Sequence, residues 1–501
     1  MQRADIRYKT GCTQPLSFIC PGTLNVPGRL NKEIVLARVL LVNPPSSIDV
    51  YSDSNIRVAI TSAPFVTLGA LAGAVLEDDH DVKVADLMIE TRPMAAYREV
   101  LRNWKPDYVG ITFTTPLVSE ARTLAAIARE ECPDTVIIGG GIHATTLPRE
   151  VLETSEFDIA AIGEGENTLR EICLGKKLEE IDGIAYFEDG EYYRTKPRAL
   201  IMDLNTLPLP AWQLYKLQYY KSPHIASRKN PVGYMETNRG CNHYCTYCSQ
   251  TIFGHNVRWK SPERIVDEMF RMLDLGFNDI HIKDDNFTAD IERAKAVCRL
   301  LIEKKFPAPW ALPTGVNVHD VDTEFFQLAK AAGCYMVSFG IESGVAEILE
   351  KVNKPQTPEL IREAVTMADD AGIETVGFFM IGLPGDTRET VEESMRFACS
   401  LPLTYVKASM TLPFPSSALF RQVDKAGRIK SRNWDLYNFH NTTDVWEHEN
   451  LSWDEIRKFY GRFHRKFYFR PSYIWKRFWR DIRMGYLWDD IKAVLSNNWG
   501  D

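Results

Sequence analysis

The sequence predicts an α/β protein made of two successive units, each built on a parallel sheet. Short apolar segments of strand length alternate with helical segments, first over residues 36–175 and again over residues 231–415. Many of the apolar segments end on Gly, Asn, Thr or acidic residues. The 501 residues also exceed the roughly 100–200 of one ordinary domain. We expect a doubly wound, Rossmann-like unit followed by a partial (β/α)6, TIM-like barrel.

The first unit contains five strand-like segments, at residues 37–45, 81–87, 108–115, 135–141 and 158–166. Ligands of a doubly wound sheet bind at the carboxyl ends of its parallel strands. The residues expected at those ends are Asn43, Pro44, Thr112, Thr114, Gly139, Gly140, Gly163, Glu164 and Gly165. No G-x-G-x-x-G follows the first strand, so a dinucleotide site has no support.

Residues 176–230 predict a linker between the two units. The linker contains a hairpin that turns at Asp189-Gly190 and a Pro-rich, extended stretch over residues 204–212. The second unit then shows six strand-like segments, at residues 232–237, 279–285, 311–318, 335–342, 375–382 and 405–412. Six repeats predict a barrel that is more open than the eight-stranded form, with its chemistry at the carboxyl ends of the strands.

The composition of the chain argues against several classes of protein. The net charge of −8 argues weakly against general nucleic-acid binding. No apolar run reaches about 18 residues, and the first residues lack the apolar core of a signal peptide. Seven of the ten cysteines are scattered, which fits a reducing cytoplasm, so clustered cysteines indicate metal binding or catalysis. Residues 1–35, with Cys12 and Cys20, predict an irregular arm.

The remaining three cysteines form a cluster in the loop after the first barrel strand. Cys241, Cys245 and Cys248 are spaced C-x3-C-x2-C. A structural zinc site has four protein ligands, so His243 inside the loop would have to be the fourth ligand beside the three cysteines. A [4Fe-4S] cluster held by three cysteines instead leaves one iron open for a substrate. We prefer the cluster, because the loop lies on the face of the barrel that carries the chemistry.

With Tyr247 before its last cysteine, this loop resembles the signature of the radical S-adenosylmethionine (SAM) enzymes. The resemblance implies that the open iron binds SAM and that a 5′-deoxyadenosyl radical abstracts hydrogen from the substrate. It implies further SAM contacts at the ends of later strands, from Asp284, Asp285, Asn317, Glu342, Ser343, Gly382 and Pro384. Asn317 departs from relatives that carry Arg there, and the two aspartates also suit a helix cap.

The first unit resembles a cobalamin-binding domain. That family threads the nucleotide tail of cobalamin between a hydroxyl pair, here Thr112 and Thr114, and a Gly-Gly pair, here Gly139 and Gly140. His143 lies beside the Gly-Gly turn. The D-x-H-x-x-G motif, whose His binds cobalt, is absent, because residues 43–64 contain no His. Either cobalamin binds without a protein His on cobalt, which we prefer, or the domain is a relic that binds none.

Residues 416–501 predict a helical, aromatic and basic C-terminal region. Residues 451–501 contain eleven Lys or Arg against six Asp or Glu. Residues 453–495 interleave aromatic residues with Arg and Lys, and Pro471 breaks them into two helices. We prefer a helical cap on the barrel with its charges reaching solvent. The alternatives are an amphipathic helix at a membrane surface, which would make the protein membrane-associated, and an RNA-facing patch.

Together the two resemblances imply a cobalamin-dependent radical SAM enzyme. The expected reaction is methylation of an unactivated carbon, or of phosphorus, on a small molecule or lipid. One SAM would remethylate cobalamin, another would give the radical, and flavodoxin or ferredoxin would supply single electrons. One alternative is oxidative ring closure, as in the anaerobic tetrapyrrole cyclases. Another is a non-catalytic cobalamin or iron–sulfur sensor. No nucleic-acid partner is expected.

Overall fold

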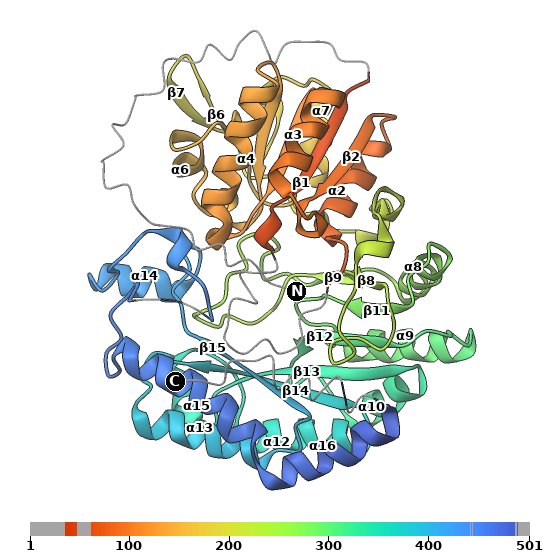
Figure 1. Cartoon of the computed structure of the whole chain (residues 1–501), viewed down its shortest axis with the longest axis vertical. Coiled ribbons are helices and arrows are strands. Elements are labelled where there is room, and N and C mark those ends of the chain that lie inside the picture. The colour runs from red at the N-terminus through yellow and green to blue at the C-terminus, as the bar shows by residue number, and fades with distance from the viewer. Residues whose placement is uncertain (1–35, 48–61, 441, 443, 486–487, 489–501) are drawn as a thin grey trace, which may run out of the picture.

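The computed structural model describes residues 36–47, 62–440, 442, 444–485 and 488 (Figure 1). Three predicted features therefore lie wholly or partly outside the described residues: the arm 1–35 with Cys12 and Cys20, the loop after the first strand, and the end of the segment 453–495. The described residues contain both predicted parallel sheets, the first upper and the second lower in Figure 1.

The first sheet has seven strands in the order β2-β1-β3-β4-β5-β6-β7. Its parallel strands are β1 (Arg38–Asn43), β2 (Asp81–Asp86), β3 (Tyr108–Thr112), β4 (Val136–Gly140) and β5 (Ile159–Ala161). The helices between them are α2 (Val66–Leu76), α3 (Pro93–Trp104), α4 (Val118–Glu131), α5 (Ile142–Thr146), α6 (Pro148–Glu153) and α7 (Glu166–Cys173). Helix α2 packs against α7, and α3 against α4. The doubly wound prediction is confirmed.

The predicted hairpin of the linker belongs to the first sheet. Strands β6 (Ile184–Glu188) and β7 (Glu191–Arg194) pair with each other, and β6 pairs antiparallel with β5. Strand β5 has only three residues, and its outer edge would otherwise leave backbone groups without hydrogen bonds. We therefore propose that the first unit extends to about residue 195, beyond the predicted boundary at 175.

The second sheet has six parallel strands in the order β15-β14-β13-β12-β11-β8. The strands are β8 (Val232–Met235), β11 (Asp279–Ile282), β12 (Trp310–Val316), β13 (Cys334–Glu342), β14 (Glu374–Ile381) and β15 (Tyr405–Met410). The helices are α8 (Pro262–Asp274), α9 (Ile291–Glu303), α10 (Thr323–Ala331), α11 (Ala346–Lys351), α12 (Pro358–Asp370) and α13 (Arg388–Ser400). This is the predicted open (β/α)6 barrel.

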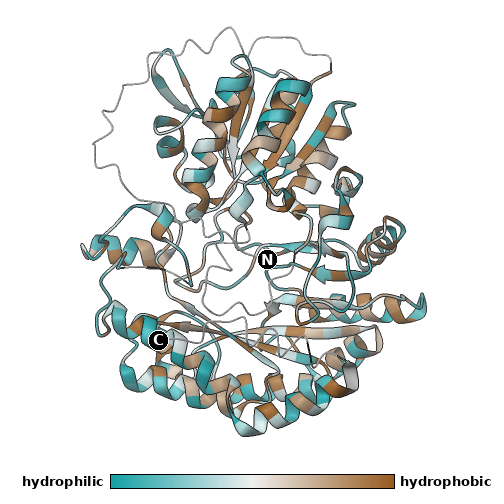
Figure 2. Cartoon of the chain, in the orientation of Figure 1, coloured by the Kyte–Doolittle hydropathy of each residue, from teal (hydrophilic) through white to brown (hydrophobic). Residues whose placement is uncertain are grey.

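Local sequence determines where the barrel helices begin. Helices α8, α9, α10, α12 and α13 each start after a Ser, Asp or Thr whose side chain accepts a hydrogen bond from the third backbone N–H beyond it. Colouring by hydropathy shows apolar strands beneath helices that are mixed in character (Figure 2). One continuous apolar core runs through both units.

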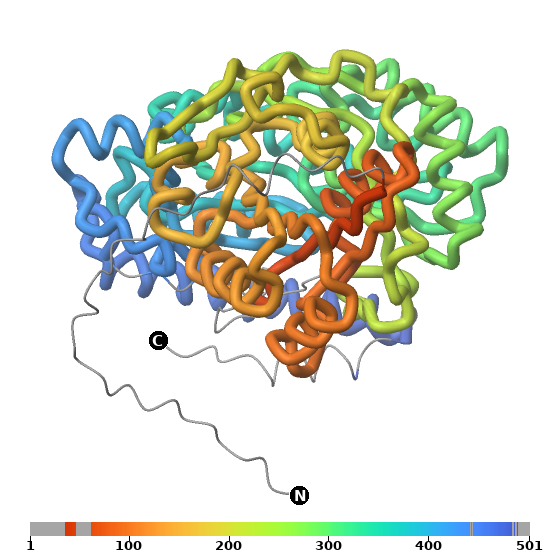
Figure 3. Tube along the Cα trace, turned by 90° about the horizontal axis from the view of Figure 1, so that it is seen from above, coloured from red at the N-terminus to blue at the C-terminus, as the bar shows by residue number. Residues whose placement is uncertain are grey.

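The segment between the two sheets packs tightly on both of them. A Cβ atom at Gly73 of α2 would lie 2.3 Å from the carbonyl oxygen of Leu209. The connecting segment can therefore approach α2 this closely only because residue 73 is glycine. Trp212 lies beside Gly69 and packs edge-on against Phe277 of the barrel unit, with ring centroids 5.6 Å apart. Viewed from above, the first unit lies over the barrel (Figure 3).

The C-terminal region contacts both units. It contains α14 (Ala418–Lys425), α15 (Trp453–Tyr468) and α16 (Pro471–Met484). The break between the last two helices falls at Pro471, as predicted. Trp434 donates a hydrogen bond from Nε1 to Glu150 of the first unit, at 2.7 Å, whereas α15 packs on β15 and α13 of the barrel. No helix among the described residues is long and apolar enough to cross a bilayer.

Candidate functional site

The cysteine loop is fixed in place at its start and its middle. Gly240 has φ +91°, and a Cβ atom there would lie 2.6 Å from the carbonyl oxygen of Asn256, so only glycine fits before Cys241. The amide of Thr246 donates to the carbonyl of Val352, at 2.9 Å, and its carbonyl accepts from the amide of Leu419, at 2.7 Å. The ends of α11 and α14 therefore hold the middle of the loop, and the three thiols lie close enough to affect one another's pKa.

The thiols suit a cluster better than a single metal ion. In the part of the chain that the structure describes, no three His, Cys, Asp or Glu side chains are arranged to hold one ion. His243, the candidate fourth zinc ligand, makes a short contact through Nε2 with Asn317. Burial raises the pKa of Cys241 and of Cys245. Three cysteines at this spacing can each supply one thiolate to a different iron of a cluster.

The two aspartates after β11 differ in what they contact. Asp284 is buried, and its carboxylate accepts from the amides of Thr237 and Asn238, at 2.6 and 3.2 Å. Asp285 is exposed, and its carboxylate accepts from the amide of Gly240 at 3.2 Å, next to Cys241. We propose that Asp284 positions the cysteine loop. Asp285 remains the aspartate that can reach a ligand amine.

At the end of β13, Glu342 reaches the cysteine loop. It has φ +63°, rare for a residue with a side chain, and its carboxylate lies 3.7 Å from the ammonium of Lys354. Burial raises the pKa of Glu342, while Lys354 and the Tyr247 hydroxyl act in the opposite direction. The Tyr247 hydroxyl also lies against Cys245. The β13 end, Lys354 and the cysteines therefore form one site.

Ser343 and Asn317 take different roles from those predicted for them. Ser343 is buried, and its hydroxyl pairs with the Ser394 hydroxyl of α13, at 3.0 Å, and accepts from the amide of Val345. Asn317 contacts His243 of the cysteine loop. We propose that Ser343 fixes the turn after β13 and that Asn317 orients the loop, neither contacting SAM directly.

The end of β14 is a glycine loop held by the C-terminal region. Gly382 has φ +78°, and Asp386 accepts hydrogen bonds from the amides of Gly382 and Leu383, at 3.0 and 2.9 Å. Burial raises the pKa of Asp386 to about 6. His448 donates from Nε2 to the carbonyl of Leu383, at 3.0 Å. We propose that Gly382 and the half-buried Pro384 offer the flat backbone surface expected beneath an adenine ring.

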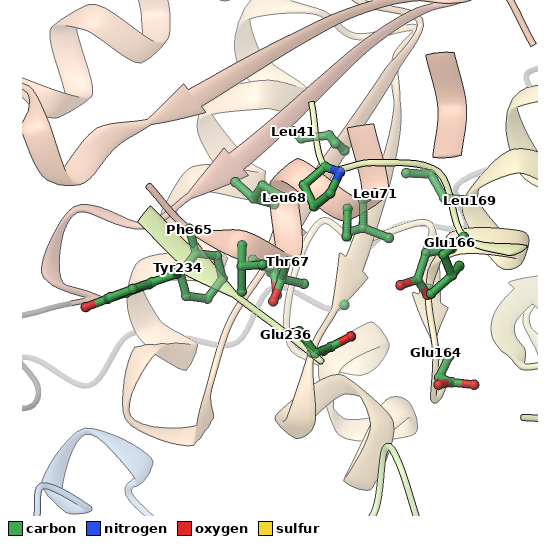
Figure 4. A pocket seen from close by; sticks show the side chains of 18 of the residues that line it. Leu41, Phe65, Thr67, Leu68, Leu71, Glu164, Glu166, Leu169, Tyr234 and Glu236 are labelled. Carbon is green, nitrogen blue, oxygen red and sulfur yellow. The ribbon is translucent and has the colours of Figure 1, made fainter. Parts of the chain in front are cut away.

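A cavity of about 590 Å³ lies between the carboxyl edge of the first sheet, the connecting segment and the barrel. In Figure 4, Leu41, Leu68 and Leu71 gather on one side of it, and the carboxylates of Glu164 and Glu236 lie on the other. Seven of the ten residues predicted for the first unit line it: Asn43, Thr112, Thr114, Gly140, Gly163, Glu164 and Gly165.

The hydroxyl and glycine positions suit a ligand in this cavity. The Thr114 hydroxyl is buried and has no hydrogen-bond partner among the residues that the structure describes. A Cβ atom at Gly140 would meet nothing within 4 Å, so this glycine faces open space. An unpaired buried hydroxyl opposite a bare backbone fits an inserted polar chain. Both residues are among those predicted for cobalamin.

Three predicted residues do not line the cavity. Pro44 is buried beside Asn43, and Gly139 faces the ring of Phe157. His143 is fully buried: its Nδ1 lies 3.2 Å from the Thr115 hydroxyl, and its ring packs edge-on against Trp434. Burial lowers the pKa of His143 to about 3. We propose that His143 supports the Gly-Gly turn from behind.

A buried ion network joins the two units beside the cavity. Arg239 donates to Glu164 (3.0 Å), Glu166 (2.5 Å) and Glu236 (2.6 Å), and Arg258 donates to Glu164 at 2.8 Å. All but Glu236 are almost fully buried. Arg239 directly precedes Gly240 and Cys241, so the first sheet is tied to the start of the cysteine loop. No local pattern in the sequence indicates the two arginines, because they lie 75 and 94 residues from Glu164.

Comparison with known proteins connects both sites to characterised families. Residues 235–398 match the profile of the radical SAM superfamily, and residues 64–173 match the B12 binding domain. An uncharacterised methyltransferase of Pyrococcus horikoshii is 31% identical over 447 residues, which are 88% of this chain and 94% of the relative. The chain belongs to the cobalamin-dependent radical SAM enzymes.

Other relatives of this radical SAM enzyme catalyse different reactions. The cytidylyl-2-hydroxyethylphosphonate methyltransferase of Streptomyces wedmorensis is 27% identical, with 86% of this chain and 90% of the relative covered. The anaerobic magnesium-protoporphyrin IX monomethyl ester cyclase of Rubrivivax gelatinosus is 29% identical, with 92% and 82% covered. The methyltransferase TsrM of Kitasatospora setae, solved with cobalamin and a [4Fe-4S] cluster, shares the fold, at 20% identity, 87% and 82% coverage and a TM-score of 0.65.

Family membership decides several of the sequence-based alternatives. The enzyme uses a [4Fe-4S] cluster and SAM, so we propose that the three-cysteine loop holds the cluster in preference to a structural zinc ion. The first unit is a B12 binding domain, and cobalamin is the third cofactor of the enzyme. The non-catalytic sensor is likewise excluded.

Lys283 is a further basic group in the barrel that the sequence analysis did not single out. It follows β11 directly, and its ammonium lies 4.5 Å from the centre of the Tyr234 ring. Burial, and then the neighbouring Lys407, lower the pKa of Lys283 to about 8. Among the described residues, no carboxylate lies within ion-pair distance of Lys283. Its position just before the Asp284-Asp285 pair was the available signal.

Proposed function

We propose that this enzyme methylates an unactivated carbon, or phosphorus, of a small molecule or lipid. The observation that carries the proposal is the cavity, because Thr114 and Gly140 of the cobalamin unit and Tyr234 and Arg239 of the barrel line the same space. A substrate in this cavity would lie between the cobalamin, which would donate the methyl group, and the SAM site, where the radical would form. The methyltransferases among the relatives support the same reaction class.

The side chains divide the work of holding the cofactors. Cys241, Cys245 and Cys248 would hold the cluster, with Asp285 and Glu342 facing the polar end of SAM and Gly382 its adenine. Thr112, Thr114 and Gly140 would hold the nucleotide tail of cobalamin. When bound, SAM with the cluster supplies a hydrogen-abstracting radical and cobalamin supplies the methyl group. The protein itself positions the substrate and excludes water, and a misplacement of ~1 Å can cost ~100-fold in rate.

The barrel interior favours a substrate with an anionic group. Lys283 lies near Tyr234, which also lines the cavity. A half-buried ammonium without a carboxylate partner is unfavourable, and an anionic ligand would relieve that cost. Flavodoxin or ferredoxin would deliver the electrons at the exposed side of the cysteine loop, where Cys248 and Tyr244 reach solvent.

Isotope labelling tests the proposed methylation. With SAM labelled on its methyl group, hydroxocobalamin and reductant, the product should carry the label. S-adenosylhomocysteine and 5′-deoxyadenosine should form in about equal amounts once substrate is present. Each forms from a different SAM molecule, so equal amounts are the signature of this reaction class.

Oxidative cyclisation is the second candidate, supported by the cyclase among the relatives. It gives a different result in the same experiment. 5′-Deoxyadenosine would form without S-adenosylhomocysteine, and the product would be lighter by hydrogens and carry no label. That outcome would contradict methylation while leaving the fold and the cofactors as described.

A further inference from the structure

Helix α16 carries its polar residues toward the protein. Arg477 donates from Nη1 to the Tyr405 hydroxyl at 2.6 Å, and Arg480 lies 2.8 Å from the carboxylate of Glu374. The Tyr473 hydroxyl donates to the carbonyl of Thr404, and Asp481 is 1% exposed. These residues recur every three or four positions, so they form one face of the helix, and that face packs on the barrel.

The opposite face of α16 is apolar and open to solvent. It consists of Ile474, Trp475, Phe478, Trp479 and Ile482, which are 39–64% exposed and which we call the α16 aromatic face. Trp488, beyond the helix, is 73% exposed. The preceding helix is the reverse, since α15 buries Phe459, Phe463 and Phe467. The predicted helical cap therefore describes α15. In α16 the apolar side chains face solvent and the polar side chains face the protein. A contiguous exposed aromatic face of this kind indicates a binding surface.

The charges around this face indicate what covers it. Residues 457–480 contain nine Lys or Arg and no Asp or Glu, in a chain whose net charge is −8, and seven of the nine remain when the inward-facing Arg477 and Arg480 are left out. Lys476 projects beside the aromatic face with 72% of its side chain exposed, and its ammonium lies 3.6 Å from the carboxylate of Asp369. Trp at the level of lipid headgroups, with basic residues at the rim, is the pattern of helices that lie in a membrane interface. A nucleic acid would match the charge but would not cover the Ile and Phe side chains.

We propose that the α16 aromatic face docks on an anionic membrane surface, with the helix lying parallel to the bilayer. The position of α16 fits this arrangement. Its inward contacts are to Glu374 and Tyr405, the first residues of β14 and β15, so it lies at the amino ends of the barrel strands. The cysteine loop follows the carboxyl end of β8, and Met235 and Glu236 at that end line the cavity, so both lie at the opposite ends of the strands. A docked enzyme therefore keeps its cofactor face away from the lipid. This inference is independent of the reaction catalysed.

Vesicle binding by the full-length enzyme tests the proposal. Sedimentation with sucrose-loaded vesicles should show binding when about a third of the lipid is phosphatidylserine, and weaker binding to pure phosphatidylcholine or at high salt. Brominated lipid should quench part of the Trp fluorescence. The double variant Trp475→Gln/Trp479→Gln should bind at least about tenfold more weakly, and Lys476→Glu should reduce the preference for anionic lipid.

Matched controls lie on the connecting segment. Tyr219 is 58% exposed and Lys216 has 65% of its side chain exposed, so Tyr219→Gln and Lys216→Glu should leave vesicle binding unchanged. The proposal is overturned if the unmodified enzyme does not bind anionic vesicles. It is also overturned if light scattering shows a dimer that the Trp variant abolishes while vesicle binding stays the same, because a second copy would then cover the face. Binding of RNA in place of vesicles would overturn it as well.

Discussion

At the scale of single residues, the sequence predicts site residues that belong to short local motifs, but it does not predict their partners from distant segments. The cysteine spacing, Thr114 and Gly140 are local signals, and the structure places them at the barrel mouth and the cavity. The contact of Ser343 with Ser394 spans 51 residues and depends on how α13 packs, which no pattern within the loop encodes. Glu164 was predicted as a cavity residue and lines the cavity, but its buried arginine partners were out of reach of sequence reasoning.

Gly140 allows a direct test of the cobalamin site. Nothing in the protein lies within 4 Å of a Cβ atom placed there, so Gly140→Val should fold normally and fill space that cobalamin needs. We expect the variant to lose most of its cobalamin affinity and to keep its iron–sulfur absorbance, with Gly140→Ala intermediate. Measuring cobalamin uptake and iron content of all three proteins decides the matter. Normal uptake by the valine variant would mean that cobalamin binds elsewhere.

At the scale of elements, hydrophobic periodicity located nearly every strand and helix of the two sheets. It placed β6 and β7 in a linker, because a hairpin carries no information on which sheet edge it will join. It also predicted a helical cap over residues 453–495, broken into two helices at Pro471, whereas only α15 turns its aromatic residues inward and α16 turns them outward. Periodicity shows which residues share a face of a helix, but it does not show which of the two faces packs against the rest of the protein.

The docking of α15 should depend on pH through His464. This buried ring donates from Nδ1 to the carbonyl of Tyr460, at 3.0 Å, and accepts at Nε2 from the amide of Ala408 of β15, at 3.3 Å. Protonation of Nε2 would bring its N–H group against the backbone N–H of Ala408, so that hydrogen bond would be lost. Burial lowers the pKa of His464 to about 4, so the folded state resists a proton that the unfolded chain accepts near pH 6.5.

Because the pKa of the folded state is the lower one, stability from His464 is present at neutral pH and decreases as the pH falls below 6.5. At pH 5 the loss should be on the order of 2 kcal/mol. His464→Gln keeps a donor and an acceptor but does not titrate. Urea unfolding at pH 7.5 and pH 5.0 should therefore show a smaller acid-induced loss for the variant than for the unmodified protein. Equal losses would show that the imidazole is not held neutral.

At the scale of the whole molecule, the order of the two units and their facing ligand edges were predictable, because parallel strands fix the edge at which ligands bind. What fixes one unit against the other was not. Contacts that do so include the packing of Trp212 on Phe277, the bond from Trp434 to Glu150, and the buried network of Arg239 with Glu164, Glu166 and Glu236. Each joins segments that are distant in sequence, and the last also leads into the cysteine loop.

Arg239 should therefore support both the stability of the enzyme and the retention of its cluster. Removing one member of a buried ion network leaves unpaired charges, which typically costs roughly 3–5 kcal/mol. Arg239→Met keeps the volume of the side chain but leaves Glu166 and Glu236 without their arginine, so we expect a large drop in the unfolding temperature and faster loss of iron under chelator. Arg102→Met removes an arginine that also pairs with a carboxylate, Glu131, but at the surface, and should change neither. If the two variants behave alike, the network does not hold the cobalamin unit to the cysteine loop.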